Sequence, residues 1–449
     1  MDLNLLRLFH NRLLGVEPDQ HHRRQHPLND PGDHTGRALL AQLPVGSEHY
    51  VLTGGGAGIS PAFRPPHFGR AAACVIAASE APDPVKAQAD YVCDGTDDQV
   101  EIQAAIDAMG TASPAGGLIM LSKGTFYIGA TISLNNAINV SLCGQGMESS
   151  ILSLIDNANT HMFQFNGAGT VPFLEIKNLK LYGNRDHNDP ASNGVYVQST
   201  PPDGAITNLF LEKVKVERFR NTGVQLYCPN LLLDKVVLEG NAEGLFASIS
   251  VIGQNGNCKF IANSIGATLG GAGIQTLTRC VFKSNTARGL SLSGASGCVV
   301  AGSLFEGNPI AVVLENSAAD NLFVANQFLN SATYDVEVPF SAGGGNAFMN
   351  NFITGSIHNL MSALFRDNRG YITENSGTAT IVSGDTSVVV THGLAKTPTG
   401  VQVTPTLLSN ANKFWVTNKT STQFTINVDG DPGEGTAKFD WRAVAGEGN

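Results

Sequence analysis

The chain has 449 residues, more than one compact domain usually holds, so two or three modules are expected. Its 42 % apolar and 15 % charged residues exclude a disordered protein. The net charge of −10 argues against nucleic acid as a partner, because non-specific binding to it needs a basic surface. We also expect no membrane insertion, since no run of about 18 apolar residues is present.

The first residues and the cysteines indicate where the chain is made. Asp2 lies near the terminus, and the segment after it lacks the clean apolar stretch of a secretory signal. The seven cysteines are scattered and have no C-x-x-C spacing. They fit small buried residues of a chain assembled in a reducing cytoplasm, rather than disulfides or a zinc site. We predict neither a metal nor a cofactor.

Residues 1–70 form the first predicted module, an extended arm. Seven of the eleven histidines lie in it, but their irregular spacing favours an arm over a metal site. The stretches 34–36, 43–46 and 50–56 read His-Thr-Gly, Leu-Pro-Val-Gly and Tyr-Val-Leu-Thr-Gly-Gly-Gly, and they resemble linker segments of phage tail proteins. The resemblance implies that the arm attaches the chain to a partner, against which its leucine-rich start would pack.

A helix is predicted near residues 97–109. Thr96 followed by Gln99 has the spacing of a capping box, and acidic residues crowd the first turn, where the helix dipole favours them. The helix would lie with one apolar face on the element that follows. That face comprises Val100, Ile102, Ala104, Ile106 and Met109.

The second module, residues 71–365, repeats with a period near 22 residues. Seven apolar positions are separated by 22, 22, 22, 23, 23 and 24 residues, each within a short segment of β-type alternation. One coil of a solenoid per repeat would stack these positions about 4.8 Å apart into a continuous apolar column. Unrelated strands of a sandwich would not keep this phase. The positions are Val216, Leu238, Phe260, Phe282, Phe305, Phe328 and Phe352.

Three further features fit the same repeat. Most positions of the column are followed closely by Asn, which we expect at a bend with left-handed backbone. Cys258 and Cys280 are 22 residues apart and should stack inside. Leu181 fits the template one coil earlier, but its step to Val216 is 35 residues, so a side loop is expected within residues 186–204.

Four motifs near the start of this module point to a family. They are Ala-Asp-Tyr-Val-Cys-Asp-Gly-Thr-Asp-Asp at 89–98, Ile-Gln-Ala-Ala-Ile-Asp at 102–107, Gly-Gly at 116–117 and Lys-Gly-Thr-Phe at 123–126. Together they resemble the opening of pectate-lyase-superfamily β-helices, an opening that bacteriophage tailspikes share. The resemblance covers residues 70–365 and implies an all-β, right-handed parallel β-helix with an N-terminal capping helix. It does not imply one activity, because the superfamily holds lyases, hydrolases, epimerases and structural members.

The third module, residues 366–449, contains six short strand-like segments and no continuation of the phenylalanine repeat. Their spacing predicts a small antiparallel β-sandwich. It looks similar to C-terminal modules of phage tail fibres and of some secreted carbohydrate-active proteins. Both tryptophans, Trp415 and Trp441, lie here, and core packing is favoured over a sugar-stacking platform.

The repeat also yields a candidate catalytic pair. Glu217 and Glu239 are 22 residues apart, so they should lie at the same phase on neighbouring coils. Two carboxylates about 5 Å apart match the nucleophile and acid of a retaining glycosidase, and repulsion between them would raise one pKa. Glu212 and Asp234 share the spacing, but each is followed by Lys, which favours a solvated ladder of mixed sign.

The expected side loop supplies candidate substrate-binding residues beside these coils. They are Arg185, Asp186, His187 and Asp189. Polygalacturonase and alginate-epimerase signatures are missing from the sequence. Three functions therefore stay open: a virion tail spike or fibre protein, a polysaccharide lyase or hydrolase, and a binding-only glycan adhesin.

The virion protein ranks first, because it accounts for the arm, the unpaired cysteines and the C-terminal module together. By resemblance it would be a homotrimer that contacts other tail proteins through the arm and binds carbohydrate. It would belong to the virion tail after assembly in the host cytoplasm. An extracellular location is the alternative.

Overall fold

The computed structural model describes Val51–Thr53, Ala62–Arg64 and residues 73–445, except residues 113, 168, 199–203, 228–229, 249–251, 272–274 and 362. Two compact units divide the chain between His67 and Phe68. In the first unit, β1 (Val51–Thr53) pairs antiparallel with β2 (Ala62–Arg64). Most of the predicted arm, residues 1–70, lies outside the described residues.

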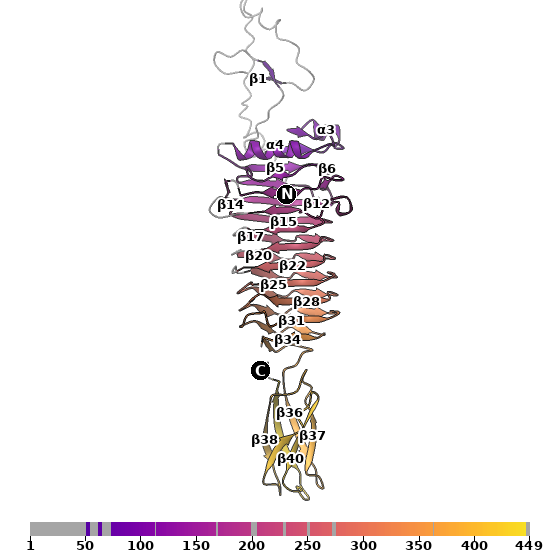
Figure 1. Cartoon of the computed structure of the whole chain (residues 1–449), viewed down its shortest axis with the longest axis vertical. Coiled ribbons are helices and arrows are strands. Elements are labelled where there is room, and N and C mark those ends of the chain that lie inside the picture. The colour runs from indigo at the N-terminus through magenta and orange to yellow at the C-terminus, as the bar shows by residue number, and fades with distance from the viewer. Residues whose placement is uncertain are drawn as a thin grey trace, which may run out of the picture. The chain divides into compact units, whose positions relative to one another are not determined.

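The second unit contains the solenoid, a right-handed parallel β-helix in which successive coils stack along one direction (Figure 1). One wall is a ten-stranded parallel sheet with the order β34-β31-β28-β25-β22-β19-β16-β13-β10-β7. Each of its strands comes from a different coil. The strands are β7 (Ile132–Ser133), β10 (Phe163–Phe165), β13 (Val195–Val197), β16 (Thr222–Leu226), β19 (Glu243–Ala247), β22 (Ile265–Gly270), β25 (Arg288–Ser293), β28 (Ile310–Glu315), β31 (Tyr334–Val338) and β34 (Ile357–Asn359).

The other strands complete each coil and also pair in parallel with those of neighbouring coils. β11 (Gly169–Val171) and β14 (Gly204–Ile206) form a separate parallel pair. The others are β3 (Ala73–Ala77), β4 (Tyr91–Val92), β5 (Gly117–Leu121), β6 (Gly124–Ile128), β8 (Val140–Cys143), β9 (Ser150–Leu154), β12 (Leu174–Tyr182), β15 (Asn208–Glu217), β17 (Asn230–Asp234), β18 (Val237–Glu239), β20 (Ile252–Gly256), β21 (Lys259–Ile261), β23 (Gln275–Thr278), β24 (Val281–Lys283), β26 (Val299–Ala301), β27 (Leu304–Glu306), β29 (Leu322–Val324), β30 (Gln327–Leu329), β32 (Ala347–Met349), β33 (Phe352–Ile353) and β35 (Leu364–Arg366).

The predicted column of apolar side chains is present, with one correction at its end. Registers align Leu181 with Val216 and continue through the phenylalanines to Phe328, and the rings stack with centroids 4.5 to 4.9 Å apart. Phe328 is followed by Ile353, however, and Phe352 pairs with Gln327 and is 36 % exposed. The last step is therefore 25 residues, because this coil is longer than those between Val216 and Phe328.

A second aromatic column begins later in the solenoid, and the sequence did not predict it. Val300 pairs with Phe323, which is followed by Phe348 and Phe365. Their rings stack at 4.4 and 4.8 Å. Both columns lie in the interior of the C-terminal coils, since all of these rings are almost fully buried.

The expected left-handed backbone is present at Asn330 after Phe328, but not at four other asparagines that follow the first column. Asn241, Asn263, Asn285 and Asn308 are fully buried, and the positive φ angle belongs to the residue before each of them. Each Oδ1 from Asn263 to Asn308 accepts hydrogen bonds from the backbone N–H and the Nδ2 of the asparagine one coil earlier. The four side chains form a ladder along one corner of the coils. There they hydrogen-bond to backbone groups that strand pairing leaves without partners.

The capping helix is α4 (Gln99–Gly110), and α3 (Asp83–Lys86) is a single short turn before it. The predicted capping box is absent. Asp98 is the N-cap, and its buried carboxylate accepts hydrogen bonds from the N–H groups of Gly95 and Tyr127. Gln99 Oε1 instead accepts from the Gly129 N–H, which ties the helix to the first coil. Val100 is 59 % exposed, so the buried face is made by Ile102, Ala105 and Ile106.

The C-terminal strands form two antiparallel three-stranded sheets around one apolar cluster, which is the predicted sandwich. Trp441 is buried and packs edge-on against Phe424 at 5.5 Å. Trp415 is 46 % exposed, so the core interpretation was wrong for it. The sheets are β36 (Glu374–Ile381), β41 (Ala437–Val444) and β38 (Gly400–Leu407), and β37 (Ser387–Thr391), β40 (Gln423–Val428) and β39 (Phe414–Thr417).

Candidate functional site

Glu217 and Glu239 lie in register at the ends of β15 and β18, as their spacing predicts. The Lys215 ammonium is placed between them. It forms an ion pair with Glu217 and lies 3.2 Å from Glu239 Oε2. The lysine therefore offsets the repulsion that two stacked carboxylates would otherwise have.

Two more charged residues from earlier coils join this group. Lys180 pairs with Glu148 and lies 3.8 Å from Glu217 Oε1, and Lys215 lies 3.6 Å from Glu148 Oε1. Burial would lower the pKa of Lys215, but its hydrogen bonds to Glu217 and Glu239 raise that pKa above its ordinary value. The hydrogen bond from Lys180 lowers the pKa of Glu148. We call these five residues the ion cluster.

Glu212 and Asp234 also lie in register, one coil apart. Each binds the lysine that follows it, with Lys213 Nζ 2.7 Å from Glu212 Oε1 and Lys235 Nζ 3.0 Å from Asp234 Oδ2. All four side chains are at least one-third exposed. This is the solvated ladder of mixed sign that the sequence predicts.

The four predicted binding residues lie on the side loop that follows β12, which includes the short turn η1 (Arg185–His187). Arg185 Nη1 donates a hydrogen bond to the Gly240 carbonyl at 3.0 Å, so the loop reaches the corner next to Glu239. Asp186 forms an ion pair with Arg218, the residue after Glu217. The loop and the ion cluster are thus neighbours.

The outer half of the loop is held by its own contacts. His187 Nδ1 lies 3.1 Å from Asn184 Oδ1 and 3.5 Å from Asp156 Oδ1. The Asp189 N–H donates to Asn159 Oδ1 at 2.7 Å, and its own Oδ1 accepts from the Ala191 N–H. Asp186, His187 and Asp189 are exposed. They present two carboxylates and an imidazole to solvent.

Glu243 is a candidate that the sequence analysis missed. It begins β19 in the ten-stranded sheet, and burial raises its pKa to about 7 despite a hydrogen bond from Thr268. Its neighbours in register are Thr222 and Ile265, neither of which is charged. The available signal was a glutamate two residues after Asn241, with no lysine or arginine beside it.

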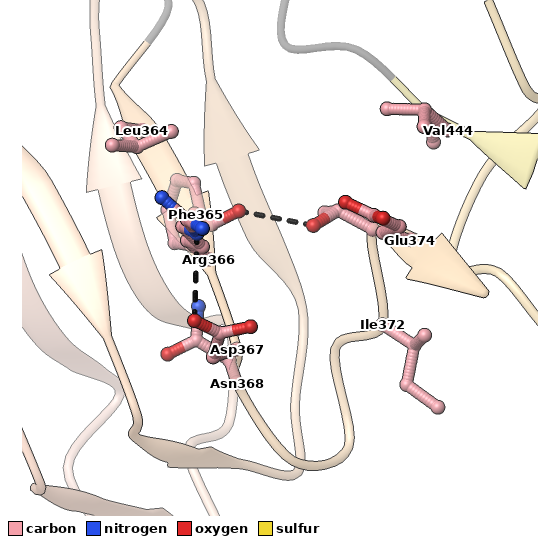
Figure 2. Close-up of a pocket in the computed structure, with 10 residues that line it drawn as sticks. Leu364, Phe365, Arg366, Asp367, Asn368, Ile372, Glu374 and Val444 are labelled. Carbon is pink, nitrogen blue, oxygen red and sulfur yellow. Dashed lines mark hydrogen bonds and ion pairs between the residues drawn. The ribbon is translucent and has the colours of Figure 1, made fainter. Parts of the chain in front are cut away.

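Figure 2 shows a pocket of about 290 Å³ at the last coil. Leu364, Phe365 and Arg366 of β35 line it, together with Glu374 of β36 and Val444 of β41. Arg366 Nε lies 3.5 Å from Asp367 Oδ2, and the Thr373 hydroxyl donates to the Phe365 carbonyl. None of the residues predicted for catalysis or binding lines this pocket.

A family profile and several solved structures match parts of this chain. A family profile described as periplasmic copper-binding protein (NosD) matches residues 170–359, less than half of the chain. No curated protein matches.

No helix among the described residues is long and apolar enough to span a membrane.

The solved structures that match are distant in sequence. ORF18 of Geobacillus virus E2 is 16 % identical over 74 % of this chain and 73 % of its own, with a TM-score of 0.40. The A-module of a mannuronan C-5 epimerase from Azotobacter vinelandii is 16 % identical over 61 % and 95 %, with a TM-score of 0.38. Tailspike gp49 of the Acinetobacter baumannii phage Fri1, a capsular polysaccharide depolymerase, is 11 % identical over 90 % and 91 %, with a TM-score of 0.38.

The described thiols of the matched segment do not fit a copper site. Its described thiols, Cys258, Cys280 and Cys298, are buried, and the first two donate to the backbone carbonyls of Leu233 and Asn255. Burial raises the pKa of Cys298, which opposes the thiolate that a metal requires. Among the described residues, the one cluster of three potential ligands is Cys93, Asp98 and Glu101, outside the match.

Proposed function

We propose that the chain is a tail spike or fibre-type component of a virion whose β-helix recognises a host-surface glycan. The arm at residues 1–70 would bind other tail proteins, and the chain would act as a homotrimer assembled in the host cytoplasm. The support is the resemblance of the motifs within residues 89–126 to the opening of tailspikes, together with the long stack of coils that follows it.

The observation that favours recognition over cleavage is the position of the Lys215 ammonium. A retaining glycosidase needs one carboxylate free to attack and a second that carries a proton. Glu217 and Glu239 both contact the same ammonium. A fixed set of charges beside the exposed Asp186, His187 and Asp189 is suited to hydrogen-bonding a polar ligand instead.

A depolymerase is the second candidate, with Glu217 and Glu239 as its catalytic residues and the side loop as its substrate-binding segment. The observation in its favour is the register that brings the two carboxylates onto neighbouring coils. Binding of a substrate would then have to displace Lys215 from one of them. A non-catalytic adhesin would use the same surface without that step.

The test is incubation of the purified protein with a panel of bacterial surface polysaccharides. Retention of a polysaccharide without new reducing ends or unsaturated products supports recognition alone. Fragments whose release is abolished in Glu217→Gln and Glu239→Gln, but not in the ladder control Glu212→Gln, would establish the depolymerase. Neither retention nor fragments from any polysaccharide would overturn glycan recognition.

A further inference from the structure

The outer face of the ten-stranded sheet carries a row of side chains that the ion cluster does not involve. Registers align one outward position on five consecutive coils, from β10 to β22. Each of these side chains is partly exposed, and the residues before and after it in the strand are buried. We call these residues the outer row. They are Gln164, Tyr196, Gln225, Phe246 and Thr268.

Aromatic rings and amides alternate along the outer row and extend to its sides. His161 stacks on Tyr196 with centroids 4.5 Å apart, and Tyr227 lies 5.8 Å from Phe246. Gln225 Nε2 donates to the Tyr227 hydroxyl at 3.4 Å. Rings that hold polar groups at their edges offer both a flat apolar surface and hydrogen bonds to a ligand.

The charge on this wall of the solenoid limits what can bind there. Within the ten strands Arg288 is the one lysine or arginine, and its Nη1 donates to Glu315 Oε1 at 2.9 Å. The same oxygen also accepts from the Ser291 hydroxyl. No arginine or lysine of these strands is left to pair with the carboxylate of an acidic sugar. Glu243, at the start of β19, lies to one side of the row.

We propose that the outer row, with His161 and Tyr227, binds a neutral polysaccharide whose chain runs across successive coils. Sugar faces would lie on Tyr196, Tyr227 and Phe246, and their hydroxyl groups would hydrogen-bond to Gln225 and Thr268. Because neighbouring parallel strands are about 4.8 Å apart, each coil offers the polymer another contact at a regular interval. This rests on the proposed glycan recognition and adds the ten-stranded sheet as a second contact surface besides the ion cluster and the side loop.

The test compares variants on two walls of the same β-helix. Tyr227→Ala with Phe246→Ala removes one ring of the row and the ring beside it, and Gln225→Leu removes an amide while keeping the side-chain size. The matched control is Phe210→Ala, because Phe210 is a partly exposed aromatic on β15 that packs on Phe173 at 5.3 Å. The probes are neutral glucans, galactans and mannans, with alginate and polygalacturonate as acidic counterparts, and binding is measured by affinity electrophoresis of the full chain.

We expect the wild type to bind at least one neutral polymer, the double variant to lose about tenfold or more in affinity, and Phe210→Ala to change little. Gln225→Leu should weaken binding with an unchanged melting temperature. Neutral-polymer binding that survives the double variant would overturn the outer row but leave glycan recognition standing. Binding of acidic polymers alone would do the same, whereas no binding of any polymer would overturn both.

Sedimentation of the same variants distinguishes a glycan from a second copy of the chain on this face. An unchanged mass for the double variant is the expected result. A lower mass together with intact glycan binding would mean that the row is a subunit interface, which would overturn the proposal.

Discussion

Phe282 stacks on Phe305 with ring centroids 4.7 Å apart and an angle of 2° between the ring planes. Both rings are completely buried, and Phe282 is covered on its other side by Phe260 at 4.5 Å. A ring in the middle of the column therefore packs against rings of the coils before and after it. The interior is a continuous stack with no gap between one coil and the next.

Phe282→Asp should abolish the soluble fold. A carboxylate at this position has no cation in the stack and loses the ring contacts on both sides, a cost of at least about 4 kcal/mol. Soluble yield and circular dichroism measure the effect. Phe352→Asp is the control, because Phe352 is partly exposed with Arg369 over its ring at 5.5 Å, and its change should stay near 1 kcal/mol. Equal behaviour of the two variants would contradict the register at β33.

Asn285→Ala tests the buried ladder. Asn285 Oδ1 accepts from the N–H and Nδ2 of Asn263, and its Nδ2 donates to the Phe260 carbonyl and to Asn308 Oδ1. Removing the amide leaves several buried groups without partners, so the free energy of unfolding should fall by about 2–4 kcal/mol. Chemical denaturation gives this value. The exposed Asn412, changed to Ala, should alter it by less than about 0.5 kcal/mol.

Glu243 predicts a pH dependence of stability. Its pKa is raised from 4.5 to about 7 in the folded chain, so folding favours the protonated carboxyl. Stability should therefore fall as the pH rises from 4.5 through 7, by on the order of 3 kcal/mol at most. Glu243→Gln should be more stable than the wild type at pH 8 and about equal at pH 4.

Thermal unfolding between pH 4 and pH 8 measures this difference. The control is Glu306→Gln, which removes the surface partner of Lys283 at 2.8 Å and should change the free energy of unfolding by less than about 1 kcal/mol. A wild-type profile that Glu243→Gln does not flatten would show that another group is responsible.

Lys215→Met tests the ion cluster. The change leaves Glu217 and Glu239 in register with no ammonium between them, so the free energy of unfolding should fall by about 1–3 kcal/mol. Part of the loss should be recovered at high salt, because salt screens the repulsion between the carboxylates. Lys213→Met, which removes an exposed partner of Glu212, should leave the free energy of unfolding almost unchanged at any salt concentration. A loss insensitive to salt would mean that Lys215 acts through packing.

The interior of the solenoid was predictable because its residue types repeat. Phe260, Phe282 and Phe305 occupy equivalent environments, so packing selects the same side chain at each step. The prediction failed at Phe352 because one longer coil shifts the register by a residue. The spacing alone does not tell which residue of that coil then points into the interior.

The candidate sites were predictable only in part. Spacing placed Glu217 and Glu239 together, but the contacts of Lys215 depend on side-chain conformations that a repeat does not specify. The outer row was missed because solvent-facing positions are not held to one residue type by packing. Gln225, Phe246 and Thr268 share a register but no chemical likeness, so no pattern in the sequence joins them.

The asparagine ladder implies that the length of the solenoid changes in steps of one whole coil. Because Asn263 and Asn285 occupy the same place on adjacent coils, residues 264–285 form one interchangeable unit. Removing that unit would join two chain ends that already match in phase, and the molecule would shorten by a single step of about 4.8 Å. A chain with this repeat can therefore be lengthened or shortened by whole turns without changing the segments that form the helix α4 and the sandwich.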